Sequence, residues 1–109
     1  MVFGDRFVPD ERFVRLAAAG SAHFRYARPP VMPTLFSDED LSALRAPLLV
    51  LLPSLDVIYR PAKAFERVRR LLPHAEVEMV PGAGHFVAME AADSIDARLL
   101  EFLNRDHPK

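Results

Sequence analysis

The sequence predicts an α/β fold built on two parallel strands, and three observations in its second half carry this prediction. A continuous apolar run, Leu48–Leu52, is typical of a strand buried on both faces, as in parallel sheets. A second run, Ala75–Val80, alternates apolar and polar residues as a half-exposed strand does. Between them, Pro61–Leu72 has helical periodicity. Strands that alternate with helices in this way predict a parallel crossover.

The first 35 residues are predicted to form a helical segment followed by a proline-rich linker. Asp10–Ala19 has apolar residues at helical spacing, and its first residue is suited to cap the helix. Gly20-Ser21 is expected to end or bend that helix, with Ala22–Arg28 continuing as a further turn or two. Three prolines within Arg28–Thr34 exclude a helix interior and a central strand there.

Residues 36–109 hold the remaining elements. Ser37 is expected to cap a short helix that runs through Leu44, because acidic residues occupy its first turn. Pro61 suits the first position of the middle helix, and Ala91–Asn104 is the last predicted helix. Asp106–Lys109 is predicted to be a frayed tail. The exposed face of the middle helix is expected to carry three arginines, Arg67, Arg69 and Arg70.

Two strands do not complete a sheet. The run at 48–52 is apolar enough to be buried on both faces, yet the chain provides only one neighbouring strand for it. An open apolar strand edge favours association with another chain. A homodimer through the strand at 48–52 is therefore one hypothesis.

Composition and charge bound the function classes. At 109 residues with half of them apolar, the chain is long enough for one domain. A net charge of −1 gives no electrostatic reason to expect a nucleic acid or an anionic membrane as partner. The sequence lacks cysteine, so it contains no disulfide and no thiolate metal site. The longest apolar run, Ala46–Pro53, is too short to span a bilayer, and Met1–Asp10 does not have the pattern of a secretory signal. The prediction is a soluble, cytoplasmic protein.

Two side chains with acid–base chemistry follow the two predicted strands. His85 closes the turn Val80-Pro81-Gly82-Ala83-Gly84-His85, and Asp56 comes shortly after the first strand. The carboxyl ends of neighbouring parallel strands meet at the same edge of a sheet. A carboxylate beside an imidazole there can hold the ring in one tautomer and stabilise its charged form. The alternatives are a structural histidine that closes a turn and an aspartate that only serves a turn.

These residues resemble the C-terminal part of α/β-hydrolases over about Phe36–Leu103. In that family the acid follows the penultimate strand, and the histidine follows the last strand in a Pro-Gly-x-Gly-His turn. Three further features suit this arrangement. Asp56 and His85 are separated by 29 positions, Glu90 follows the histidine, and a helix closes the chain. The resemblance implies a strand-helix-strand-helix parallel unit at the C-terminal edge of an α/β-hydrolase sheet, preceded by cap-like helices. Residues 1–35 would be the cap-like segment and linker, and residues 36–109 the C-terminal part of the core.

The resemblance also implies a chemistry: hydrolysis of a carboxylic ester or a related acyl or C–C bond in a small-molecule substrate. His85 would be the general base and then the acid, and Asp56 would orient it, with no metal and no organic cofactor. Pro53-Ser54 departs from the Gly and acidic residue that usually open the acid motif. No serine lies in a G-x-S-x-G elbow: Ser21, Ser37, Ser42, Ser54 and Ser94 all lack the flanking glycines.

The missing elbow predicts that the chain alone is inactive and that its nucleophile comes from other residues. A fragment of a longer enzyme, a truncated reading frame and one half of a split protein all fit. The alternative is a non-catalytic remnant that dimerises or binds a partner through its open sheet edge.

Other residues have two interpretations each. Ser54 is a turn residue rather than a nucleophile, because it lies beside the acid and has no elbow. His74, Glu76 and Glu78 are metal-ligand types, but alternating glutamates favour a solvated strand face. Gly82-Ala83-Gly84 is a weak candidate for a phosphate-binding loop. Glu90 is expected to serve a helix first turn or cap. Tyr59 and Phe86 line either a cleft mouth or the core.

Overall fold

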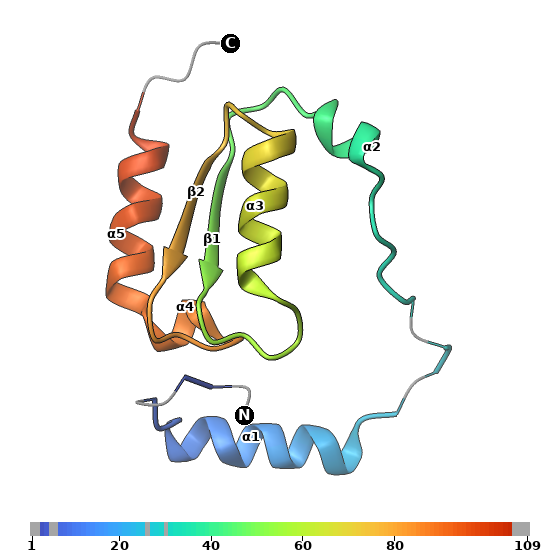
Figure 1. The fold of residues 1–109 in the computed structure, drawn as a ribbon. Helices are drawn as coiled ribbons and strands as arrows, with labels where there is room; N and C mark the ends of the chain where they lie inside the picture. Colours follow the sequence, from blue (N-terminus) through green and yellow to red (C-terminus); the bar gives the residue numbers. More distant parts are fainter. Residues whose placement is uncertain (1–2, 5–6, 26, 30, 106–109) are drawn as a thin grey trace.

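The computed structural model describes residues 3–4, 7–25, 27–29 and 31–105 (Figure 1). Tyr26 and Pro30, which fall in the predicted helix extension and linker, and the predicted tail Asp106–Lys109 lie outside the described residues. The described elements are α1 (Glu11–His23), α2 (Asp38–Ser42), β1 (Leu49–Pro53), α3 (Pro61–Leu71), β2 (Glu76–Val80), α4 (Val87–Glu90) and α5 (Ala92–Leu103).

The predicted parallel strand pair is confirmed. β1 and β2 pair in parallel, in a register that runs from Leu49 opposite Glu76 to Pro53 opposite Val80. α3 connects them and packs on both strands, while α5 follows β2 and lies on the other side of the pair (Figure 1). Ile95 of α5 and Val80 of β2 form the centre of the buried apolar cluster. The unit of residues 49–103 is thus a two-stranded α/β layer with a helix on each face.

The prediction that β1 is buried on both faces along its length is wrong for this chain. Only Leu52 and Pro53 are buried, and residues 49–51 are half-buried. The physical reason is the missing neighbour: within the described residues the sheet has two strands, so the outer edge of β1 has no partner strand. β1 therefore has more apolar side-chain surface than the described residues bury.

The two glutamates of β2 lie on a solvent-accessible face as expected, with side chains 35% and 45% exposed, and they also bind an arginine of α5. Glu76 and Glu78 point toward α5, where the Arg98 guanidinium bonds both carboxylates, with Nε 2.6 Å from Glu78 Oε1. Arg105 also binds Glu76, at 2.8 Å. The hydrogen bonds from Arg105 and Arg98 lower the pKa of Glu76 below its ordinary value. These carboxylates therefore tie α5 to the sheet while they remain partly exposed to water.

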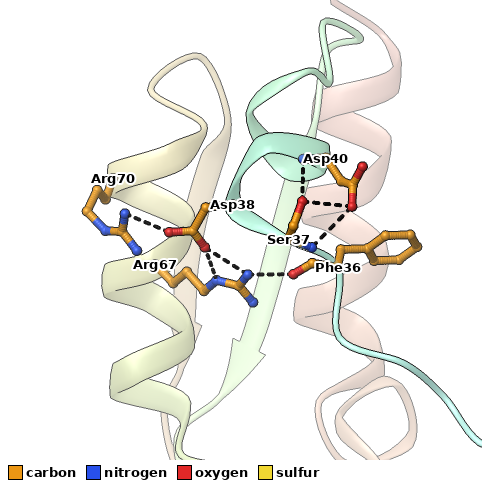
Figure 2. A network of polar contacts seen from close by, with 6 residues as sticks. All are labelled: Phe36, Ser37, Asp38, Asp40, Arg67 and Arg70. Carbon is orange, nitrogen blue, oxygen red and sulfur yellow. Dashed lines mark hydrogen bonds and ion pairs between the residues drawn. The ribbon is translucent and has the colours of Figure 1, made fainter.

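Figure 2 shows a second polar network, which fastens α2 to α3. Ser37 caps α2 as predicted, in a capping box in which Asp40 N–H donates to its hydroxyl over 3.1 Å. Asp38 accepts hydrogen bonds from Arg67 at 2.9 Å and from Arg70 at 3.0 Å. The expected exposed face is confirmed for Arg70, whose side chain is 62% exposed, whereas Arg67 at 34% is partly buried by this contact. Since successive turns of α3 hold one carboxylate, α2 is fixed on α3 even though it ends at Ser42 and not at Leu44.

Two features of the helices differ from prediction. α1 passes through Gly20, and Phe24 N–H still donates to Gly20 C=O over 2.7 Å, because one glycine lowers helix stability without breaking the ladder. The last predicted helix, Ala91–Asn104, is confirmed as α5 to within one residue at each end, and α4 is an additional helix before it that was not predicted. Ala91, whose ψ of 35° is not helical, separates the two. α4 is a single turn, too short for a periodic signal. No helix in the described ranges has the length and apolar composition needed to cross a bilayer.

Candidate active site

Asp56 is fixed in the turn that follows β1. Its side chain is only 1% exposed, and its Oδ1 accepts the backbone N–H of Ile58 over 2.8 Å. An aspartate that bonds the backbone two residues ahead forms a local turn of its own and loses its rotamer freedom. The carboxylate is therefore held with its second oxygen, Oδ2, available to a partner.

The second strand end holds the loop Pro81–His85, called here the His85 loop. Gly82 adopts a φ of 74°, which a side chain would disfavour, and this turns the chain sharply after β2. Ser54 Oγ accepts the N–H of Gly82 over 2.9 Å, and Leu55 N–H donates to Ala83 C=O over 2.9 Å. These bonds join the two strand-end loops directly, so the acid and the histidine are carried by one connected piece of backbone.

The structure brings the two predicted residues together. His85 Nδ1 lies 2.8 Å from Asp56 Oδ2. Burial opposes ionisation of Asp56, but the hydrogen bonds from His85 and from Ile58 N–H, with the charge of His85, outweigh it and lower the Asp56 pKa. The His85 side chain is 43% exposed. With Nδ1 held by the carboxylate, Nε2 is the nitrogen that can exchange a proton with a reactant.

Ser54 does not act on His85 in this geometry. Its hydroxyl accepts the N–H of Gly82, and in the described part of the chain no serine hydroxyl hydrogen-bonds to the imidazole. The structural role expected for Ser54 is therefore the one observed, and its contact joins the two loops. Sequence alone did not indicate this bond, because its partner is 28 positions away.

The glycine N–H groups of the His85 loop have internal partners, which argues against a phosphate-binding loop. Gly82 N–H donates to Ser54, and Gly84 N–H donates to Glu90 Oε2 over 2.8 Å. The hypothesis that Glu76 and Glu78 are metal ligands is also not supported, because both carboxylates bind Arg98. Within the described ranges, no three His, Asp or Glu side chains are grouped as metal ligands would be.

The two aromatic residues near the pair differ in their surroundings. Phe86 lies edge-on to His85 with ring centroids 5.8 Å apart, and it stacks on Phe3 at 5.0 Å. Tyr59 is adjacent to the acid: burial, with the charge of Asp56, raises the pKa of its hydroxyl, which keeps it protonated at neutral pH. Both side chains are 38% exposed, so each packs on one side and faces open space on the other.

The sequence relatives of the chain are hydrolases. No protein-family model matches it. It is 36% identical over 74 residues to the uncharacterized carboxylesterase nap and 32% identical over 71 residues to carboxylesterase YbfK, both of Bacillus subtilis (strain 168). The matches cover 68% and 65% of this chain but 25% and 24% of the relatives. The chain thus spans about a quarter of the length of these curated relatives.

Solved structures give the same result. The crystal structure of carboxylesterase CesB (YbfK) from Bacillus subtilis matches 94% of this chain and 38% of its own, with a TM-score of 0.85 and 27% identity. Naproxen esterase (carboxylesterase NP), also from Bacillus subtilis, matches 88% of this chain and 35% of its own, with a TM-score of 0.81 and 33% identity. The chain matches the C-terminal segment of the α/β-hydrolase superfamily.

The α/β-hydrolase fold expected from residues 36–103 is thereby confirmed. The structural match also extends further than the sequence indicated. A coverage of 94% is reached only if most of the first 35 residues align as well. The N-terminal segment with α1 is therefore part of the shared architecture. Its assignment as cap-like remains a prediction.

Proposed function

We propose that this chain supplies the general base and its orienting acid to a serine-type hydrolase of carboxylic esters or related acyl or C–C bonds. One observation carries the proposal: the 2.8 Å contact of His85 with Asp56 at the ends of two adjacent parallel strands. The similarity to two carboxylesterases supports an ester-like small molecule as substrate.

In the proposed reaction, Asp56 accepts the Nδ1–H of His85, which leaves the Nε2 lone pair unprotonated. Nε2 takes the proton of a serine hydroxyl while its oxygen bonds to the ester carbonyl carbon. The resulting imidazolium is stabilised by the buried carboxylate, and it then protonates the leaving alcohol as the ester C–O bond breaks. Water repeats the sequence: His85 removes its proton as the water oxygen bonds to the acyl carbon, and the imidazolium then returns that proton to the serine oxygen as the acyl–serine bond breaks. No metal or organic cofactor enters this scheme.

The nucleophile of the scheme comes from residues outside the 109 of this sequence. Among its serines, Ser54 is nearest in sequence to the acid, and its hydroxyl accepts the Gly82 N–H and makes no hydrogen bond to the imidazole. Ser37 and Ser94 serve helix turns: the first caps α2, and the second donates to Ala91 C=O. The proposal therefore includes inactivity of the chain by itself.

The test is a complementation assay with a chromogenic short-chain ester. The 109-residue chain is assayed alone and after mixing with a separately expressed piece of carboxylesterase nap that comprises the residues this chain does not match. We expect turnover only in the mixture, and none when the chain carries His85→Ala. Turnover by the chain alone that His85→Ala abolishes would contradict the missing nucleophile. A mixture that forms a stable complex without turnover would contradict the proposed catalytic role.

A second candidate function is non-catalytic association through β1. The observation that favours it is the unpaired outer edge of β1 within the described residues, with its apolar residues 49–51 only half-buried. Light scattering after size-exclusion chromatography would then give twice the mass of one chain, and Leu49→Lys would reduce it to one. A folded monomer at high concentration contradicts this candidate.

A further inference from the structure

We propose that Glu90 is a positioning residue for the His85 loop and that it acts together with Gly4. Oε2 of Glu90 accepts two backbone N–H groups, that of Gly84 over 2.8 Å and that of Gly4 over 2.6 Å. Gly84 directly precedes His85, so the first bond fixes the peptide from which the imidazole projects. This inference rests on the proposed function, because positioning matters here only if His85 is the base.

Position 4 requires a glycine, because the backbone there passes very close to the His85 loop. A Cβ at this position would lie 2.0 Å from the carbonyl oxygen of Gly82 and 2.8 Å from Glu90 Oε2. Both neighbours are part of the His85 loop or its support, and the first is backbone that cannot swing away. Only a glycine lets the N-terminal segment come close enough to donate its N–H to Glu90. The N–H groups of Gly4 and Gly84, 80 positions apart in the sequence, thus meet on one oxygen atom of Glu90.

The two hydrogen bonds of Glu90, to Gly4 and to Gly84, form a joint between the N-terminal segment and the His85 loop. Aromatic packing extends this joint to α1. Phe3, next to Gly4, stacks on Phe86 with centroids 5.0 Å apart, and Phe13 of α1 meets Phe86 edge-on at 6.0 Å. Figure 1 shows α1 lying across the end of the sheet at which both strands terminate. α1 itself has no buried residue. The attachment of α1 to the His85 loop therefore depends on this joint, which consists of Glu90, Gly4 and the rings of Phe3, Phe13 and Phe86.

The chemistry of Glu90 suggests its conservative replacement. A carboxylate that accepts N–H groups makes stronger hydrogen bonds than a neutral acceptor does. Oε1 of Glu90 is buried and has no hydrogen-bond partner in the described part of the chain. Glutamine can keep a carbonyl oxygen at the Oε2 position with its amide group at the other, so Glu90→Gln retains the geometry with weaker bonds. Glu90→Ala removes the acceptor altogether.

The test measures hydrogen exchange and proton spectra of the full 109-residue chain by NMR. Exchange of the Gly84 amide is referred to amides inside α3 in the same sample. We expect Glu90→Ala to accelerate it about 10- to 100-fold, as loss of a charge-assisted bond should, and Glu90→Gln to accelerate it less. Glu66→Ala, which removes an exposed glutamate on α3, is the matched control and should leave it unchanged.

Gly4→Ala tests the other half of the joint. It should abolish the nuclear Overhauser contacts between the Phe3 and Phe86 rings, whereas Gly20→Ala should preserve them, because a Cβ at Gly20 meets nothing within 4 Å. The low-field resonance of the His85 Nδ1 proton, bonded to Asp56, reports on positioning directly. It should broaden or disappear in Glu90→Ala and return in Glu90→Gln.

Equal Gly84 exchange and an equal His85 proton signal in Glu90→Ala and Glu66→Ala would overturn the proposal. If Glu90→Ala does not fold, Glu90→Gln and Gly4→Ala decide: both indistinguishable from their controls would overturn it as well. None of these readouts involves ester turnover. A failed complementation assay with the expected exchange pattern would therefore refute the proposed function and leave the joint intact. The reverse pattern would refute only the joint.

Discussion

The unit of residues 49–103 and the helix α1 differ in how they are held. The buried apolar residues among those described all belong to the unit: Leu52, Leu72, Val80, Ala83 and Ile95. α1 has no buried residue, although it is the longest helix described. The unit builds the Asp56–His85 pair from its own turns and strands, whereas α1 reaches the pair through the contacts of Gly4, Phe3 and Phe13. The unit of residues 49–103 thus forms the site, and α1 only contacts its surroundings.

The largest expected contrast is between apolar substitutions in the two regions. Ile95→Ala removes a side chain that is 7% exposed at the centre of the cluster, and it should lower the free energy of unfolding by about 2–5 kcal/mol. Leu16→Ala in α1, where the side chain is 72% exposed, should change it by less than about 0.5 kcal/mol. Urea denaturation followed by circular dichroism measures both. Similar losses at the two positions would refute the division into regions.

A pH-dependent contrast is expected at the acid. The pKa of Asp56 is below its ordinary value of 3.8 in the folded chain, so the unfolded chain takes up the proton first on acidification. The stability that the ionised Asp56 contributes is fully present above about pH 5 and is lost as the pH falls through the folded pKa. The stability difference between the natural chain and Asp56→Asn should therefore shrink as the pH falls below about 5. A difference that grows on acidification would contradict this assignment.

The smallest contrast concerns two arginines. Arg98 is 17% exposed and bonds both Glu76 and Glu78, whereas Arg12 is 92% exposed and pairs with Asp10. Arg98→Ala should lower the urea midpoint measurably, because it leaves two carboxylates side by side on β2. Arg12→Ala should leave the midpoint unchanged, since exposed pairs contribute little. If the two variants have the same midpoint, the Arg98 network does not hold α5 on the sheet.

The sequence predicted the backbone of the unit and its acid–histidine pair, for physical reasons. Apolar runs bounded by prolines limit where β1 can lie, and parallel strands place their ends together, so the proximity of Asp56 and His85 follows. The continuation of α1 past Gly20 and the presence of α4 were less predictable, because a glycine tolerated within a helix and a single helical turn leave no periodic signal.

Long-range polar contacts could not be predicted. Arg98 with the β2 glutamates, Asp38 with two α3 arginines, and Glu90 with Gly4 each join residues at least 20 positions apart. Local patterns show that such side chains are charged, which favours solvent, but they do not identify a partner. Gly4 had no distinguishing feature in sequence, since its importance depends on a carbonyl oxygen nearly eighty residues later.

The most direct measurement of the central claim compares two histidines in the completed enzyme. In a fusion of this chain to the part of carboxylesterase nap that it does not match, kcat/KM for a chromogenic ester is measured for His85→Ala and for His74→Ala. His74 lies exposed after α3 and serves as the matched control. We expect His85→Ala to lower kcat/KM by a factor on the order of 10³ or more and His74→Ala to leave it within about twofold. Equal activity of the two variants would contradict the role of His85 as the base.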